Sequence, residues 1–302
     1  MPELPEVETI KRQLLKEVIG KKIKEVELRL PKLAYFDGEK GDGSTGSPQA
    51  AKNFKRNVEG SKIVKADRAA KILILKLSNG YTLLVHLKMT GQLIYRAKNG
   101  NLKMGGHPWP PAAVEVPNKW THIIFHFADG SKLYFNDLRQ FGYMKLVRTE
   151  KLGEQKEIKK LGIEPFDKNF TIELFSQMLK KRGGAKIKPL LMDQSFISGI
   201  GNIYADESLY YAGILPTRPA GKIKLEEVKR LLRGIKTILE KSIAQGGTSS
   251  DTYVTLSGQK GGYEKYLKVY GREGKKCLRC EGMIKRIKLD GRSAHFCPKC
   301  QR

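Results

Sequence analysis

The first residues of the chain, MPELPEVE, place a proline at position 2 directly before a glutamate at position 3. After removal of an initiator methionine, Pro2 would carry a free secondary amine with a pKa of about 8, which leaves a useful unprotonated fraction at neutral pH. Such an amine can attack a sugar C1′ to give an iminium, with Glu3 close enough to exchange protons. A proline followed by acidic residues is also an ordinary helix start, so these residues alone leave both interpretations open.

All four cysteines lie in the last 26 residues, as two Cys-x2-Cys pairs separated by 16 residues. Four thiolates at this spacing are typical of a tetrahedral zinc site, and so short a segment needs a cross-link to fold. Disulfides are the alternative, which we disfavour because the first residues do not resemble a secretion signal. We expect one structural Zn²⁺ ion, bound by Cys277, Cys280, Cys297 and Cys300.

A β-hairpin is predicted between the two cysteine pairs. Asp290-Gly291 is a strong hairpin-turn dipeptide, and the runs at 283–289 and 293–296 are suited to the two strands. Arg292 follows the turn directly and would project from its tip, where a guanidinium can reach a phosphate or a sugar hydroxyl. A solvated arginine is the alternative interpretation.

The charge balance points to a polyanionic partner. The chain has 57 Lys and Arg against 31 Asp and Glu, a net charge of +26 on 302 residues and a pI near 9.8. Its hydrophobic fraction of 40% is enough for folded cores rather than a disordered basic tail. No apolar run approaches the length of a membrane span, so we expect no membrane partner and a cytoplasmic, nucleoid-associated protein.

The predicted secondary structure around these groups changes along the chain. Apolar residues from Leu4 to Val18 recur at helical spacing and predict an amphipathic first helix. From Ile23 to Val147 short β-rich runs predict a β-sandwich, with strands at 71–75, 81–85 and 122–127. Two Gly-rich segments, at 37–49 and 97–119, are expected to be surface insertions.

After Glu150 the pattern predicts helices, at 170–180, 189–196, 202–211 and 225–244. The connection Ser198-Gly199-Ile200-Gly201-Asn202 joins two of them, and its glycines permit a tight turn. Asn202 is expected to be a helix N-cap. The same position, with free amides and a carboxamide, would also suit a phosphate.

These patterns together predict an α+β multidomain protein. We expect an N-terminal domain at 1–149 with the first helix and the β-sandwich, a helical domain at 150–270 and a zinc β-hairpin finger at 271–302; the resemblance described next implies that the first is catalytic and the second binds DNA.

Three motifs carry a family resemblance over essentially the whole chain. MPELPEVE, the segment LMDQSFISGIGNIYADESL and the four-cysteine finger together resemble bacterial formamidopyrimidine-DNA glycosylases. The resemblance implies a helix-two-turn-helix in the helical domain and a bifunctional glycosylase and AP lyase of base excision repair. Such an enzyme removes 8-oxoguanine and formamidopyrimidines from damaged double-stranded DNA and cleaves the strand by β,δ-elimination. A monomer on DNA needs no partner subunit, so we expect a monomer without an obligatory protein partner.

By this resemblance, roles follow for several residues. Pro2 is the Schiff-base nucleophile, and Glu3 is the acid that assists base loss and ring opening. Lys71 is a catalytic lysine at the lesion, although on its own it would be a strand-edge lysine. Arg292 holds the phosphate near the lesion and takes part in δ-elimination, and Asn202 grips the same backbone.

Base excision requires the nucleotide to leave the stack, so side chains must fill the vacated space. The resemblance assigns this role to Met89, Arg139 and Phe141, which lie at two probable turns; without it, Met89 and Phe141 would be taken as core residues. His86 and Trp120 are further expected DNA contacts, with Trp120 standing where a DNA-contacting histidine is common. The segment 248–262 matches a loop that covers the extruded base.

The chain departs from the family pattern in places. The usual DPRRFG reads DLRQFG here, so Gln140 replaces a cation and should weaken one phosphate contact, and the segment 97–119 is longer than usual. Two alternatives follow from the residues: an endonuclease VIII-type enzyme for oxidised pyrimidines, and a non-catalytic zinc-stabilised nucleic-acid-binding protein. The second predicts lesion-independent binding that survives substitution of Pro2.

Overall fold

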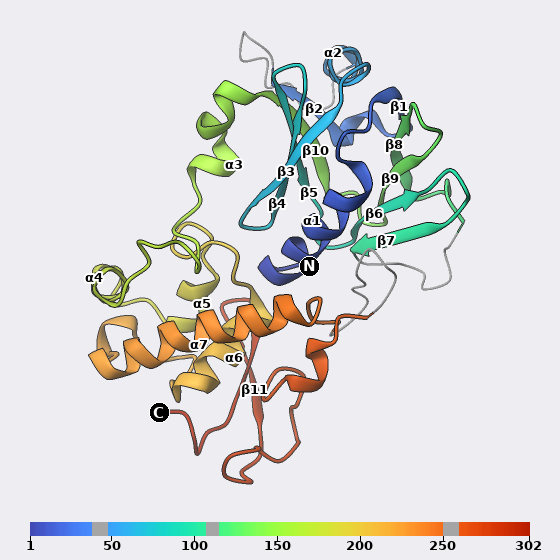
Figure 1. Ribbon diagram of the computed structural model, residues 1–302. Helices are drawn as coiled ribbons and strands as arrows, with labels where there is room; N and C mark the ends of the chain where they lie inside the picture. Colours follow the sequence, from blue (N-terminus) through green and yellow to red (C-terminus); the bar gives the residue numbers. More distant parts are fainter. Residues whose placement is uncertain (38–47, 107–114, 250–259) are drawn as a thin grey trace. The chain divides into compact units, whose positions relative to one another are not determined.

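The structure is a computed structural model that describes residues 1–37, 48–106, 115–249 and 260–302 (Figure 1). These residues form two compact units. The first comprises Met1–Lys159 and Gly246–Gly262, and the second comprises Lys160–Gln245 and Tyr263–Arg302. A short segment therefore leaves the second unit and returns to the first before the chain enters the finger.

The first unit begins with helix α1 (Leu4–Val18), as predicted. Val7, Ile10, Leu14 and Val18 are buried on its apolar face, and this face packs against strands β3 and β4 (Figure 1). Pro5 occupies the first turn, where its missing N–H leaves no intrahelical bond unmade. The N-terminal residues are thereby held on a packed helix rather than on a loose end.

Two five-stranded sheets form the predicted β-sandwich. Their strand orders are β1-β8-β9-β6-β7 and β2-β10-β5-β4-β3, antiparallel throughout except for the parallel pair β2 and β10. One buried cluster draws side chains from both sheets and from α1, for example Leu73, Val85 and Phe125. The strands are β1 (Ile23–Leu28), β2 (Ala34–Asp37), β3 (Ile63–Ala69), β4 (Ile72–Leu77), β5 (Tyr81–His86), β6 (Gly91–Arg96), β7 (Leu102–Gly106), β8 (Thr121–Phe127), β9 (Lys132–Asp137) and β10 (Tyr143–Arg148).

The two expected insertions contain regular structure. Strand β7 lies within 97–119 and pairs with β6, because Asn99 and Gly100 close a tight turn in which Gly100 has φ +87°. The segment 37–49 contributes Asp37 to β2 and its last residues to helix α2 (Pro48–Val58). The remaining parts of both segments, 38–47 and 107–114, lie outside the described residues.

Helices dominate the second unit, as predicted. Helix α6 is buried on nearly all sides, because α5 and α7 pack against it, and α7 buries one face that includes Val228, Leu232 and Ile235. The helices are α4 (Ile172–Lys181), α5 (Ile187–Met192), α6 (Asn202–Ala212) and α7 (Leu225–Ala244). A short helix, α3 (Lys156–Lys159), closes the first unit, and 3-10 turns lie at Pro31–Leu33, Thr149–Glu154, Ala220–Lys222 and Tyr263–Tyr266.

Two details of the helical prediction were wrong. The predicted helix 189–196 begins earlier, at Ile187, and ends at Met192, because the Asp193 carboxylate accepts bonds from the amide (2.9 Å) and hydroxyl (2.7 Å) of Ser195 and turns the chain. Gly201, not Asn202, is the N-cap of α6. Asn202 is the first helical residue, which leaves its carboxamide available for contacts outside the helix.

The predicted hairpin of the finger is present as β11 (Lys285–Leu289) and β12 (Arg292–Phe296). Asp290 and Gly291 both have positive φ, +46° and +79°, as a tight two-residue hairpin turn requires. Arg292 is therefore the first residue of β12, where it pairs with Leu289 and remains exposed. Within the described residues, no helix is long and apolar enough to cross a membrane.

Candidate active site and nucleic-acid interface

Pro2 and Glu3 lie at the buried start of α1, and Glu3 is only 3% exposed. The Glu6 carboxylate organises this end of the helix. One of its oxygens accepts the Glu3 amide at 2.9 Å, and the other accepts the Thr248 amide at 2.8 Å. A residue more than two hundred positions away is thereby fixed beside the first turn.

Thr248 belongs to the segment predicted to cover an extruded base, of which 250–259 lies outside the described residues. Hydrogen bonds hold the two ends of this segment next to each other. Thr248 pairs with Gly262, and the Gly261 amide donates to the Ser249 hydroxyl at 2.7 Å. Gly261 is required for this approach, since an added Cβ would overlap the Gly247 carbonyl oxygen.

Lys71 lies in the turn between β3 and β4 and is 5% exposed. Lys71 thus directly precedes β4 and is not part of the strand, whereas the sequence predicted a strand at 71–75. Arg68 joins this turn to α1: its guanidinium donates to the Ala70 carbonyl at 2.8 Å and to the Glu8 carboxylate at 3.1 Å. Burial acts to raise the pKa of Glu8, but ion pairs with Lys11, Arg12 and Arg68 outweigh it and keep the pKa below its usual value.

His86 ends β5, where it pairs with Ile72, the neighbour of Lys71. Burial, together with the positive charges of Lys88 and Lys71, lowers the pKa of His86 to about 3. The ring is therefore neutral at physiological pH. Its Nδ1 accepts the Lys88 amide at 3.0 Å, which leaves the proton on Nε2 as a hydrogen-bond donor.

The two turns predicted to enter DNA are joined by Asp137, which is 1% exposed. Its carboxylate accepts the Thr90 hydroxyl next to Met89, the Arg139 amide at 3.2 Å and the Gly142 amide at 2.6 Å. Asp137 is thus a structural residue for which no role was expected from the sequence. A lone acidic residue at the end of an apolar strand was the available signal, because a buried carboxylate needs several donors.

The side chains on these turns differ in exposure. Phe141 is 55% exposed and lies under the Arg139 guanidinium, 4.9 Å from the ring centroid, so it is not a core residue. Met89 is half-buried. Trp120 is also half-buried beneath the Lys119 ammonium, and its carbonyl accepts the Asp137 amide at 3.0 Å. All four side chains therefore lie on strand connections that Asp137 ties together.

In the second unit the structure brings Asn202 next to the finger hairpin. The Asn202 carboxamide nitrogen lies 3.4 Å from the Ser293 hydroxyl, directly after the exposed Arg292. The carboxamide oxygen is buried and has no hydrogen-bond partner among the described residues. The N–H groups of Asn202 and Arg292 are thus available to a phosphate from neighbouring positions, whereas the unpartnered carboxamide oxygen, an acceptor, would need a donor.

A buried ionic network, which the sequence analysis missed, holds this arrangement. The Lys188 ammonium lies 2.6 Å from one Asp206 carboxylate oxygen and donates to the Ser293 carbonyl. The other Asp206 oxygen accepts the His295 amide at 2.9 Å and faces His295 Nδ1 at 3.0 Å. Lys188 and Asp206 are almost fully buried. The signal was present, because acidic residues in a helix with no polar face must be paired.

Glu207 performs a similar role for the segment leading to the finger. Its carboxylate accepts the backbone amides of Lys268, Val269 and Tyr270 at 2.9–3.0 Å. Burial raises the pKa of Glu207 in spite of these bonds. The hydrogen bonds of the Glu207 carboxylate thus go to the backbone of this segment.

The four cysteines have the geometry of a zinc site. All four thiols are free of disulfides, and their sulfur atoms lie within 4.8 Å of one another. The Cys277–Cys300 and Cys280–Cys297 sulfur distances, 3.8 and 3.5 Å, are close to the edge of a tetrahedron with Zn–S bonds of about 2.3 Å. The four residues can therefore hold one structural Zn²⁺ ion.

Neighbouring hydrogen-bond donors stabilise the thiolate form of Cys277. Burial opposes ionisation, but hydrogen bonds from the Tyr210 hydroxyl and from the amides of Arg279 and Cys280 bring the pKa of Cys277 down to about 6. Tyr210 is the donor at 3.2 Å, since a metal-bound thiolate has no proton to give.

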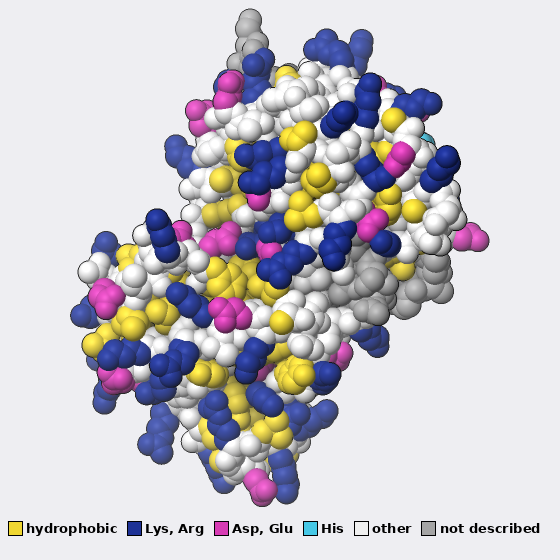
Figure 2. Space-filling model, viewed as in Figure 1, with side chains coloured by type: hydrophobic (Ala, Val, Ile, Leu, Met, Phe, Trp, Pro, Cys, Tyr) yellow, Lys and Arg dark blue, Asp and Glu magenta, His cyan; other side chains and the backbone are white. Residues whose placement is uncertain are grey.

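Lys and Arg side chains outnumber Asp and Glu on the surface shown in Figure 2. A shallow depression of about 370 Å³ on the finger hairpin includes Arg286, Lys288 and Arg292 in its lining. Cationic surface is thus available in each unit for a polyanion.

Sequence comparisons place this geometry in a known family. The chain matches the sequence models of the formamidopyrimidine-DNA glycosylase N-terminal domain (1–144), the H2TH domain of the same enzymes (161–254) and a zinc finger found in FPG and IleRS (274–302). A curated formamidopyrimidine-DNA glycosylase from Pelotomaculum thermopropionicum is 43% identical over all of this chain and 99% of its own length. The chain belongs to the formamidopyrimidine-DNA glycosylase family.

Other members of the family are also similar to this chain over its full length. The enzyme of Listeria monocytogenes is 39% identical over the full length of both chains. Among solved structures, Lactococcus lactis Fpg bound to DNA with an abasic site superposes with a TM-score of 0.84 at 33% identity, and it covers 99% of each chain. A Lactococcus lactis FPG mutant in complex with Fapy-dG DNA gives 0.85 at 33% identity, covering both chains completely. The predicted family and fold class are thereby confirmed.

Proposed function

We propose that this chain is a DNA glycosylase and AP lyase that excises oxidised purines from duplex DNA. The observation that carries the proposal is the buried Pro2-Glu3 pair at the start of α1, in the same unit as the buried Lys71 turn. Similar solved structures support it, since they are complexes with DNA that contains an abasic site, Fapy-dG or carbocyclic 8-oxo-G. The full-length identity to formamidopyrimidine-DNA glycosylases favours purine over pyrimidine lesions.

The proposed chemistry begins once Met1 has been removed. The Pro2 amine attacks C1′ of the damaged nucleoside, the bond from C1′ to the base breaks and the base leaves with the electron pair. Glu3 protonates the sugar ring oxygen as the ring opens, and the nitrogen becomes a Schiff base. Loss of a C2′ proton then expels the 3′ phosphate, and a second elimination expels the 5′ phosphate. Lys71 would be a further catalytic residue at the lesion.

DNA contacts are proposed on both units. Met89, Arg139 and Phe141 would fill the space left by the extruded nucleotide, and the Asp137 carboxylate keeps their two turns together. His86, neutral and with its proton on Nε2, would donate to a phosphate, and Trp120 would contribute a further contact. The segment 248–262 would cover the extruded base.

On the second unit, Asn202 and Arg292 would hold the phosphate backbone near the lesion. The zinc ion would keep the finger folded and take no part in the reaction. We further propose a monomer that acts on damaged double-stranded DNA without a protein partner, in the cytoplasm and associated with the nucleoid.

The deciding experiment is borohydride trapping on a duplex with a single 8-oxoguanine, followed by peptide mapping of the cross-link. We expect an adduct on the amine of Pro2, which would also demonstrate removal of Met1. A matched duplex with an oxidised pyrimidine should trap more weakly. Equal binding to damaged and undamaged duplex without any adduct would instead identify a non-catalytic DNA-binding protein.

A further inference from the structure

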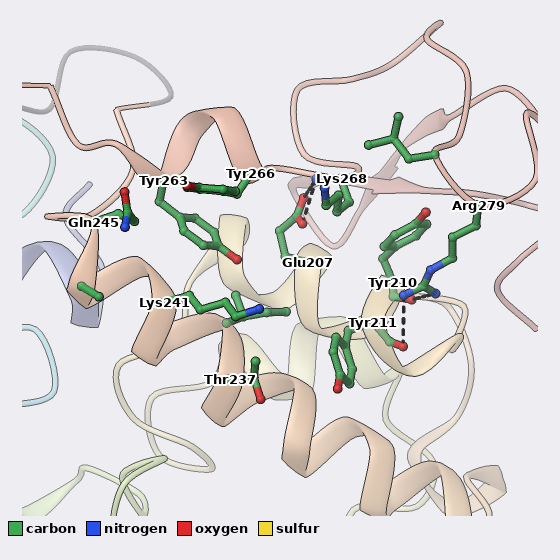
Figure 3. Close-up of a pocket in the computed structure, with 13 residues that line it drawn as sticks. Glu207, Tyr210, Tyr211, Thr237, Lys241, Gln245, Tyr263, Tyr266, Lys268 and Arg279 are labelled. Atoms are coloured by element: carbon green, nitrogen blue, oxygen red, sulfur yellow. Dashed lines mark hydrogen bonds between the residues drawn. The ribbon is translucent and has the colours of Figure 1, made fainter.

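The second unit contains a cavity of about 620 Å³ that takes no part in the proposed chemistry (Figure 3). Its walls come from α6, α7, the 3-10 turn at Tyr263–Tyr266 and the first zinc knuckle. None of the residues proposed above to contact DNA is among its described lining residues. Its volume lies in the range of about 300–1,000 Å³ that is usual for small-molecule sites.

Four tyrosine rings line the cavity, Tyr210 and Tyr211 from α6 and Tyr263 and Tyr266 from the 3-10 turn. Tyr263 is 4% exposed, whereas Tyr266 and Tyr211 are 42% and 36% exposed at the rim. The rings of Tyr263 and Tyr266 lie 5.7 Å apart at an interplanar angle of 40°. The cavity therefore offers aromatic surface both in its depth and at its mouth, which suits a planar ring.

The position of Tyr211 depends on a glycine in the middle of α7. A Cβ on Gly234 would lie 2.7 Å from the ring of Tyr211. Glycine inside a helix is unfavourable by roughly 0.5–1 kcal/mol relative to alanine. The helix thus retains an unfavourable residue at the point where Tyr211 packs closely against it.

The walls are cationic. Lys241, Lys268 and Arg279 line the cavity, and Glu207, the carboxylate among the described lining residues, is occupied by three backbone amides. Arg279 is also engaged, since it donates to the Tyr210 carbonyl at 2.6 Å and stacks over the Tyr210 ring at 4.0 Å. Lys241 differs, because its side chain points into the cavity in Figure 3 and it forms no ion pair within the described part of the chain.

We propose that this cavity binds a small planar aromatic anion of about the size of a mononucleotide. The ring would pack against the tyrosines, and its phosphate or carboxylate would meet the Lys241 ammonium. An aromatic cation is disfavoured by the same charges. Leu278 and Arg279 lie between two zinc ligands, Cys277 and Cys280, so a bound ligand would also contact the zinc knuckle.

The test uses the full-length, zinc-loaded protein and 8-azidoadenosine 5′-monophosphate as a photoaffinity probe. We expect cross-links to map to peptides containing Tyr211 or Tyr263–Lys268. Titration with AMP, adenosine, inorganic phosphate and 2-naphthoate should show that ring and anion are both needed. Comparison of 2-naphthoate with 2-naphthyl phosphate, which share the same ring, then identifies phosphate or carboxylate as the preferred anion.

Two variants and a matched control distinguish binding in the cavity from non-specific attraction to a basic protein. Lys241→Gln should weaken AMP binding about fivefold or more by loss of a charge-assisted contact. Tyr266→Ala, at the exposed rim, should weaken it about threefold through lost stacking. Lys229→Gln removes the same charge from the exposed face of α7, outside the cavity, and should change the affinity less than twofold, within about 0.4 kcal/mol.

Three results would overturn the proposal. They are cross-links that map outside the cavity, equal losses in Lys241→Gln and Lys229→Gln, and displacement of AMP by a duplex with an abasic-site analogue. The first two would indicate non-specific attraction to a basic protein, and the third would make the cavity part of the DNA site. None of them depends on whether Pro2 forms an adduct, so the proposed enzymatic function is tested separately.

Discussion

The two units hold their proposed functional residues in different ways. In the first unit, Glu6 and Asp137 are buried carboxylates that bind backbone amides and a hydroxyl, and they fix loops on a sandwich that has a large core of its own. In the second unit, the finger has only a small apolar cluster, around Val269, Ile284 and the cysteines. It is held by a metal site and by a fully buried ion pair, Lys188–Asp206.

The two units should therefore respond differently to the loss of a single interaction. A loop fixed by hydrogen bonds to amides can lose one bond and keep its fold, because the sandwich is stabilised elsewhere. A small element fixed by charge and metal depends on every partner, because a buried charge without its counterion is strongly unfavourable. Substitutions in the first unit should therefore alter chemistry more than stability, and substitutions in the second should do the reverse.

The largest effect is expected for Pro2→Gly. Excision of 8-oxoguanine should fall roughly a thousandfold, because the secondary amine is lost, while damaged DNA still binds within about threefold. Single-turnover cleavage and filter binding measure the two quantities. Pro5→Ala, in the same helical turn, is the control that keeps the amine. Excision at the wild-type rate by Pro2→Gly would remove Pro2 from the mechanism.

Lys188→Met should destabilise the second unit by about 3–5 kcal/mol, because it leaves Asp206 buried without its counterion. Urea unfolding followed by circular dichroism measures the change. Lys229→Met, which breaks an exposed pair with Glu226, should cost less than about 1 kcal/mol. Similar losses in the two variants would show that the buried network is not what holds the finger.

Removal of zinc with a chelator should unfold the finger and leave the sandwich intact. We expect DNA affinity to fall by roughly one to two orders of magnitude, since a charged contact contributes about 1.5–3 kcal/mol and Arg292 lies in this element. Cys280→Ser should reproduce the loss without chelator. Undiminished DNA binding by the metal-free protein would separate the finger from the interface.

The smallest effect concerns pH. The pKa of His86 is lowered to about 3 in the folded chain. Below pH 6.5 the imidazole is therefore protonated in the unfolded chain but stays neutral in the folded chain. Stability should therefore fall as the pH decreases from about 6.5 towards 3, by about 1–2 kcal/mol at pH 5 relative to His86→Gln. Urea titrations from pH 7 to 4.5 measure the difference, with His126→Gln as control. Parallel curves for wild type and His86→Gln would contradict the lowered pKa.

Local signals in the sequence were sufficient to predict several elements. Apolar spacing predicted α1 and α7, the Asp290-Gly291 turn predicted the finger hairpin, and the two cysteine pairs predicted the zinc site. Each of these depends on neighbours within a few residues, or on a spacing that only one metal geometry satisfies. The chemistry suggested at Pro2 and Glu3 also comes from adjacent residues.

Features that depend on distant partners could not be predicted from these local signals and follow from the fold. The fold placed Lys71 in a buried turn directly before β4, joined the Met89 and Arg139 turns through Asp137, and set Asn202 beside Ser293. It also paired Lys188 with Asp206 and formed the tyrosine-lined cavity. A one-dimensional pattern shows that Asp206 must have a partner but does not say which, because the pairing of buried charges is fixed only when the helices pack.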